Sequence, residues 1–172
     1  MANAISRAID IHHHYVPLQL IEETRRHGQS FGVSTTEMRG SHALSFAGSK
    51  PHRLQPPIFD VEGHLKVMDQ GQVQMATLEA NTNSLGYRLS GEQGEAWSKH
   101  YNECVNDLIQ RHPDRFAGTA TVPLQDPRRA AKVLEHAVSQ LDFRGATLTV
   151  STIISRISMS SELKLRSWMS LW

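Results

Sequence analysis

Cysteine and long apolar runs are the first things this chain lacks. Its 172 residues include a single cysteine, Cys104, so an internal disulfide is excluded. No apolar stretch approaches the roughly 20 residues that a membrane-spanning helix requires. Residues 1–8 also lack the apolar core of a signal peptide. These absences predict a cytoplasmic protein that has no membrane partner.

An excess of charge of one sign is lacking too. Eighteen basic residues balance seventeen acidic ones, and the formal net charge is +1. Because the basic residues form no stripe, we expect no nucleic-acid partner. No glycine-rich phosphate loop follows any of the strands expected below, which argues against nucleotide binding. With 39% hydrophobic and 20% charged residues, the composition is typical of one globular domain with a sizeable core.

Histidine, by contrast, is concentrated near the N-terminus. The run His12-His13-His14 follows Ile9-Asp10-Ile11, a pattern that favours a strand, and Pro17 ends it. Side chains alternate along a strand, so His12 and His14 share one face and can share a metal ion, while His13 points away. A solvated loop is the alternative interpretation. A remnant of a purification tag is disfavoured, because the run is short and internal.

The rest of the chain alternates between expected strands and helices. Residues 18–58 are expected to be irregular, either a lid over a site or a flexible loop, because glycines and prolines interrupt every apolar pattern. The later elements are expected as a helix over 60–70, a strand over 73–78, a helix over 97–109 stopped by His112-Pro113, a strand over 116–122, a helix from Asp126-Pro127 and a strand over 145–150. The inner face of the last helix is expected to be Ala130, Leu134, Ala137, Val138 and Leu141. This alternation predicts an α/β fold with parallel strands, either a barrel or a doubly wound sheet.

Several short motifs together resemble one known group. They are Asp10-x-His12-x-His14-x-x-Pro17, Met68-Asp69-Gln70, Asn102 followed by His112-Pro113-Asp114-Arg115-Phe116, then Val122-Pro123-Leu124-Gln125-Asp126-Pro127, and Phe143-Arg144-Gly145. From about residue 9 to about residue 150, the chain resembles the amidohydrolase-related family that includes aminocarboxymuconate semialdehyde decarboxylase.

The resemblance implies a distorted (β/α)8 barrel of the TIM type, here a partial one with about four βα units and a long loop after the first strand. It implies that His12 and His14 bind a divalent metal, usually zinc. In the family, a third histidine and an aspartate from later strands complete the site. Members decarboxylate or hydrolyse small, often aromatic, carboxylic acids, so a carboxylate substrate is implied, and the choice between lyase and hydrolase chemistry stays open.

Length limits this interpretation. A (β/α)8 barrel takes about 250 residues, whereas four strands fill residues 1–150 here, which we interpret as the N-terminal half of the barrel. Residues 151–172 carry seven serines and neither histidine nor aspartate. We interpret them as an atypical tail left by truncation or a frame shift, with an apolar-faced helix as the alternative. An open half barrel exposes strand edges, so we expect a homo-oligomer or an aggregate.

Two hypotheses of function follow. The chain is a metal-dependent decarboxylase or hydrolase, or it is a catalytically incompetent fragment of one that persists by association.

Cys104, on an apolar helical stripe, is interpreted as a buried structural thiol rather than a nucleophile. Glu79, at the end of the second strand, could face the metal, but we do not count it among the expected ligands. Arg53 and Arg88 either bind a substrate carboxylate or are solvated loop residues.

Overall fold

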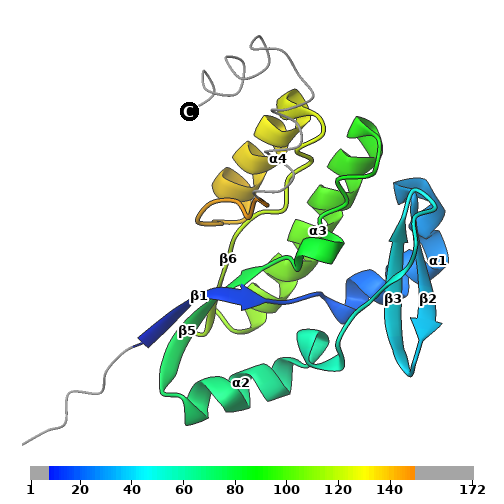
Figure 1. Cartoon of the computed structure of the whole chain (residues 1–172). Helices are drawn as coiled ribbons and strands as arrows, with labels where there is room; N and C mark the ends of the chain where they lie inside the picture. The colour runs from blue at the N-terminus through cyan, green and yellow to red at the C-terminus, as the bar shows by residue number, and fades with distance from the viewer. Residues whose placement is uncertain (1–7, 150–172) are drawn as a thin grey trace, which may run out of the picture.

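The computed structural model describes residues 8–149, which form two small sheets with helices packed around them (Figure 1). The elements are β1 (Ala8–His14), α1 (Leu18–Phe31), β2 (Val33–Met38), β3 (Ser41–Phe46), β4 (His52–Arg53), η1 (Pro56–Phe59), α2 (Val61–Gln70), β5 (Val73–Glu79), η2 (Thr82–Ser84), α3 (Gly91–Arg111), β6 (Phe116–Gly118) and α4 (Pro127–Gln140). The predicted tail over residues 151–172 lies outside the described residues.

The central sheet is parallel and has the strand order β1-β5-β6. A single parallel bridge, Ala120 to Ala146, continues it beyond β6. This bridge stands where a fourth strand was predicted, and Val150 lies outside the described residues. In Figure 1, the parallel strands lie between α2 and the pair α3 and α4. The predicted α/β class with parallel strands is confirmed, and β1 is an edge strand of this sheet.

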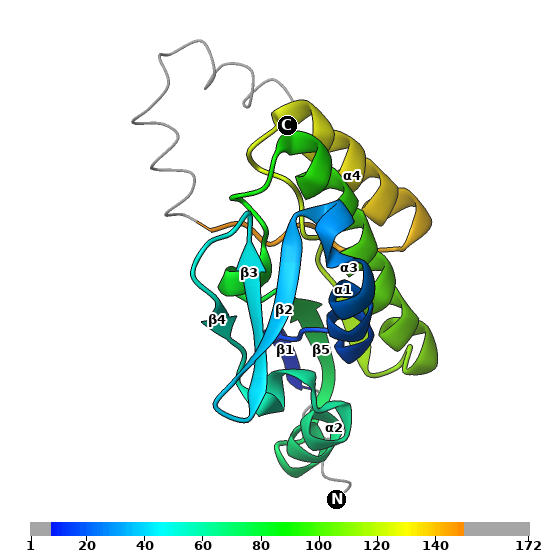
Figure 2. The same cartoon turned by 90° about the vertical axis from the view of Figure 1, so that its right-hand side faces the viewer.

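The prediction that residues 18–58 are irregular is wrong. They form α1 and an antiparallel sheet of β2, β3 and β4, which stands beside α1 in Figure 2. Gly32, Gly40 and Gly48 lie at turns between elements, and Gly28 lies inside α1 without breaking it. Gly32 ends α1 with φ 68°, and Arg39-Gly40 form a two-residue turn with φ 49° and 69° between the paired residues Met38 and Ser41. Two successive positive φ values are what a tight hairpin needs.

Side-chain caps set where the later helices begin. Asp60 Oδ1 accepts a hydrogen bond from the Gly63 backbone N–H at 3.0 Å and starts α2. Asp126 does the same for α4, accepting from the Arg129 N–H, with Pro127 at the first helical position. Capping of this kind satisfies backbone donors that have no partner inside the helix. The helix starts predicted at Asp60 and Asp126 are therefore confirmed.

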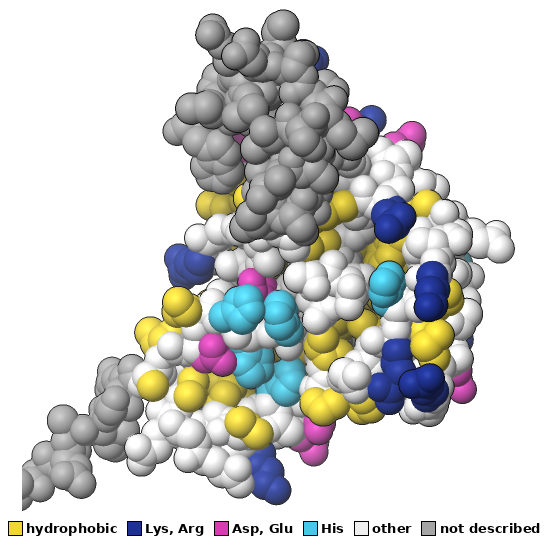
Figure 3. Space-filling view, in the orientation of Figure 1, with side chains coloured by type: hydrophobic (Ala, Val, Ile, Leu, Met, Phe, Trp, Pro, Cys, Tyr) yellow, Lys and Arg dark blue, Asp and Glu magenta, His cyan; other side chains and the backbone are white. Residues whose placement is uncertain are grey.

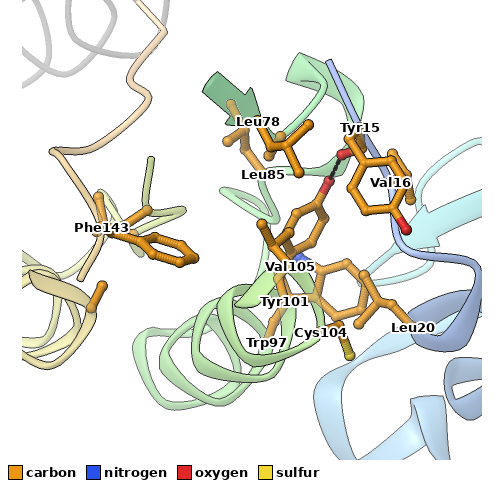
Figure 4. Packing of buried hydrophobic residues seen from close by; sticks show 14 of the residues in the cluster. Tyr15, Val16, Leu20, Leu78, Leu85, Trp97, Tyr101, Cys104, Val105 and Phe143 are labelled. Atoms are coloured by element: carbon orange, nitrogen blue, oxygen red, sulfur yellow. Dashed lines mark hydrogen bonds between the residues drawn. The ribbon is translucent and has the colours of Figure 1, made fainter. Parts of the chain in front are cut away.

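The core lies where α3 packs against the parallel sheet (Figure 4). Trp97 and Tyr101 of α3 are fully buried, and each satisfies its polar atom: Trp97 Nε1 donates to the Ser84 carbonyl at 2.8 Å and Tyr101 OH to the Tyr15 carbonyl at 2.6 Å. Cys104 is buried on the same helix, as predicted. On α4 the prediction is partly wrong, because Val138 is exposed and Val133 takes its place in the core.

Candidate metal centre

The carboxyl ends of β1 and β5 bring three potential metal ligands together. In the parallel pairing His14 lies opposite Glu79, the last residue of β5. The ligand atoms of His12, His14 and Glu79 all lie within 4.8 Å of one another. The strand order thus adds a carboxylate to the predicted histidine pair, at the end of the strands where barrel enzymes place their chemistry.

The two imidazole rings lie edge to face. Their ring centroids are 4.7 Å apart, with an interplanar angle of 73°. His12 Nδ1 is in ion-pair contact with Glu79 Oε1. Figure 3 shows a cluster of histidine side chains on this face, next to acidic side chains. The expectation that His12 and His14 share a face is confirmed, whereas their role as metal ligands stays a prediction.

Burial within the cluster suits a cation. The Glu79 side chain is only 10% exposed, while His12 is 71% exposed and forms the outer side of the cluster. His14 Nδ1 is buried and has no hydrogen-bond partner among residues 8–149. Buried imidazole nitrogens normally have a partner, and a metal ion supplies one. The residues present therefore fit a divalent cation.

A pair of threonines holds the carboxylate. Thr147 Oγ1 donates to Glu79 Oε2 at 2.9 Å, and the Thr147 and Thr119 hydroxyls are 2.6 Å apart. Such outer contacts fix the orientation of a metal ligand. Thr147 was not predicted to belong to the site. The only signal for it in the sequence was its place opposite the apolar residues of the expected strand over 145–150.

His13 lies apart from this cluster, as expected from the alternation. Its Nδ1 is 2.8 Å from Asp10 Oδ2, and its ring packs edge-on against His64. Partial burial opposes ionisation of Asp10, but hydrogen bonds from the His13 side chain and the His12 backbone N–H outweigh it, and the pKa of Asp10 is lowered. Asp10 therefore carries a negative charge that fixes the start of the histidine run.

The structure does not bring the two candidate arginines to the cluster. Arg53 Nε donates to the Met38 carbonyl at 3.1 Å, which ties β4 to the end of β2. Arg88 is exposed between η2 and α3. Within residues 8–149, no hydrogen bond or ion pair joins either arginine to His12, His14 or Glu79.

The fold and the cluster can now be compared with known proteins. A family model described as amidohydrolase matches residues 9–156. The chain belongs to the amidohydrolase family. The predicted resemblance is thereby confirmed. Within residues 8–149, no helix is both long enough and apolar enough to cross a membrane.

The curated relatives of this amidohydrolase chain include several decarboxylases. It is 32% identical over 94 residues to gamma-resorcylate decarboxylase from Rhodococcus jostii, an alignment that covers 54% of this chain and 29% of the relative. It is 23% identical over 133 residues to 2-amino-3-carboxymuconate-6-semialdehyde decarboxylase from Caenorhabditis elegans, which covers 77% and 33% of the two chains. This chain thus spans about a third of the length of the curated relatives it matches.

Solved structures agree on the fold. The 2,6-dihydroxybenzoate decarboxylase from Rhizobium superposes with a TM-score of 0.58 at 19% identity, over 81% of this chain and 37% of that one. A 5-carboxyvanillate decarboxylase from Novosphingobium aromaticivorans, solved with manganese, gives a TM-score of 0.59 at 19% identity, over 85% and 42%. At this identity the likeness shows the fold alone, and the partial coverage agrees with a partial barrel.

Proposed function

We propose that this chain supplies part of the metal site of a decarboxylase that acts on a small aromatic carboxylic acid. The observation that carries the proposal is the meeting of His12, His14 and Glu79 at the carboxyl ends of β1 and β5. The names of the relatives support it, because several are decarboxylases of aromatic acids. Hydrolysis, the other chemistry expected from the sequence, is the alternative, and it is supported by a structural neighbour named as an amidohydrolase.

The donor set favours a divalent cation, and we propose zinc. Neutral imidazole is a preferred donor for zinc, whereas oxygen donors suit manganese, the ion in the solved neighbour. A bound divalent metal polarises a substrate oxygen or lowers the pKa of a water molecule. His12 and His14 would hold the ion with their ring nitrogens. Glu79 would offset its positive charge, held by Thr147.

A second candidate is an incomplete enzyme that binds metal without turnover and persists by association. What favours it is the share of the curated relatives that the chain covers, 29% and 33% in the two cases above. In such a chain the groups that move protons during catalysis would be lacking. Metal binding and turnover must therefore be measured separately.

Calorimetric titration with Mn²⁺ and Zn²⁺ tests the metal site. Loss of two ligands in His12→Ala/His14→Ala should abolish Mn²⁺ binding, and Glu79→Gln should weaken it at least about tenfold, since even outer partners of a ligand contribute that much. His27→Ala, an exposed histidine of α1, is the matched control and should bind as the wild type does. Equal Mn²⁺ affinity in the wild type and the double variant would exclude this site.

Release of CO2 from 2,6-dihydroxybenzoate tests the chemistry. The decarboxylase proposal expects metal-dependent release by the wild type and none by His12→Ala/His14→Ala. Metal binding that depends on both histidines, together with no CO2 from this or related hydroxybenzoates, would support the incomplete enzyme instead.

A further inference from the structure

A second cluster of potential metal ligands lies away from the strands, where α1 packs on α3. Its members are Glu23 of α1 and His100 and Cys104 of α3, and their ligand atoms all lie within 4.8 Å of one another. His100 and Cys104 are one helical turn apart, so both side chains project from the same face of α3. The contact between α1 and α3 brings Glu23 to that face, and Figure 2 shows the two helices beside each other.

The imidazole of His100 is held in one orientation. Its ring stacks on Phe31, with centroids 5.3 Å apart and planes 3° apart. Nε2 is 2.5 Å from Glu23 Oε2, and Nδ1, on the other side of the ring, is 4.0 Å from Glu103 Oε2. A proton on Nδ1, facing the Glu103 carboxylate, leaves the Nε2 lone pair free to bind a metal.

The thiol of Cys104 completes the cluster from the buried side. Its Sγ is 4.0 Å from His100 Nε2, and the residue is 4% exposed. Burial first, and then the negative charges of Glu23, Asp107 and Glu103, raise the pKa of the thiol to about 12. These carboxylates disfavour a thiolate when no metal is bound, but they attract a cation. A metal ion bound to the sulfur would therefore shift the thiol–thiolate equilibrium towards the thiolate.

We propose that Glu23, His100 and Cys104 form a second divalent-metal site, suited to zinc, that ties α1 to α3. Sulfur, imidazole and carboxylate are the three ligand types that zinc takes in proteins, and a water molecule would complete four-coordination. Ligands at zinc distances lie about 3.5 Å apart in a tetrahedron. The sulfur–nitrogen separation is already near that value, and the partly exposed Glu23 carboxylate has to move outward by about 1 Å.

Binding of the ion to these three ligands balances in charge and in protons. The ion displaces the thiol proton, which passes to solvent, and separates His100 Nε2 from Glu23 Oε2 by binding between them. One thiolate and one carboxylate then neutralise the divalent charge. Because α1 opens the segment that carries β2, β3 and β4, the ion would fasten this segment to the helix that packs on the parallel sheet.

Titration with Co²⁺ gives a specific test, since Cys104 is the only cysteine of the chain. A thiolate-to-cobalt charge-transfer band in the near ultraviolet can arise only from this residue. We expect the wild type to show this band, together with the visible bands of four-coordinate cobalt, and added Zn²⁺ to remove them. His12→Ala/His14→Ala should keep the band in full, which separates this site from the cluster on β1.

Variants of each ligand complete the test. Cys104→Ser should lose the charge-transfer band, and His100→Gln and Glu23→Gln should each weaken cobalt binding at least about tenfold. Glu22→Gln, one residue away on α1 and exposed, is the matched control and should leave binding unchanged. Circular dichroism checks that each variant folds, and if Cys104→Ser does not, the two partly exposed ligands still decide the matter. A wild type without the band, or a band unchanged in both His100→Gln and Glu23→Gln, would overturn the proposal.

Discussion

One phenol holds the peptide that follows the histidine run. Tyr101 OH donates to the carbonyl of Tyr15, the residue directly after His14, at 2.6 Å. Burial raises the pKa of Tyr101 well above its usual value, so the phenol keeps its proton and the hydrogen bond. The position of the candidate metal ligands on β1 therefore depends on a side chain of α3.

Tyr101→Phe removes this hydrogen bond, so the buried Tyr15 carbonyl loses the donor that Tyr101 supplies. A buried acceptor that loses its donor costs about 1–3 kcal/mol, so we expect the free energy of unfolding, measured by urea denaturation, to fall by that amount. Tyr15→Phe is the control, because it keeps both the accepting carbonyl and Tyr101. Equal stability of Tyr101→Phe and the wild type would show that the hydrogen bond contributes nothing.

Among the elements, α1 and β2 approach each other so closely that only glycine fits at one contact. A Cβ at Gly28 would lie 2.2 Å from the Val33 carbonyl oxygen and 2.8 Å from Thr24 Cγ2. The helix itself would prefer alanine by about 1 kcal/mol. The backbone contact outweighs this preference, because a carbonyl within a hairpin cannot withdraw without moving the strand.

We expect Gly28→Ala to destabilise the protein by about 1–3 kcal/mol, the range for an overpacked contact. Thermal and urea denaturation measure the change. Gln29→Ala, next to it on the exposed side of α1, should lie within about 0.5 kcal/mol of the wild type. A stabilising Gly28→Ala would mean that α1 and β2 do not pack this closely.

Charged side chains join α3 to α4. Glu95 accepts from Lys99 at 2.8 Å and pairs with Arg129, which also pairs with Asp126. Hydrogen bonds from Lys99 and Arg129 lower the pKa of Glu95. Its folded pKa is thus below the unfolded one, so the pair adds stability above the unfolded pKa and loses it as the pH falls through the folded pKa.

Glu95→Gln should therefore lower the unfolding temperature by at most a few degrees at neutral pH, because the Lys99 and Arg129 side chains are 40% exposed and water screens the pairs. In acid, where Glu95 is protonated in both states, the difference between variant and wild type should vanish. Thermal melts from neutral to acidic pH measure it. A difference that persisted or grew in acid would contradict the assigned pKa direction.

At the scale of the whole molecule, the outer edge of β1 is the feature that most affects behaviour in solution. Among the described residues, β1 pairs only with β5 in the parallel sheet, and Ile9 and Ile11 are 59% and 80% exposed. Exposed edges with apolar side chains tend to pair with another chain.

We expect the chain to associate through this edge, so that light scattering after gel filtration gives dimers or larger species. Ile11→Lys should shift the equilibrium towards monomer, since charged side chains on an edge strand oppose pairing. Val67→Lys, at an exposed position of α2, is the matched control and should leave association unchanged. A wild type that stays monomeric at every concentration would refute this expectation.

Local chemistry in the sequence determined where elements begin and end. Asp60 and Asp126 predicted helix starts because a cap acts on backbone groups two or three residues away, and His112-Pro113 predicted the end of α3 for an equally local reason. The strand pattern also predicted that His12 and His14 share a face, since alternation needs only the strand itself. Each of these conclusions uses residues adjacent in the chain.

Only the tertiary structure decided which distant residues meet. Glu79 joins the histidines because β1 and β5 pair in one register, and Glu23 reaches His100 because α1 packs on α3. The order in residues 18–58 was also not predicted from the sequence, because Gly28 lies inside α1, where the packing of α1 on β2 leaves no room for a side chain. Register and packing depend on interactions summed over the whole domain, and no short motif encodes that sum.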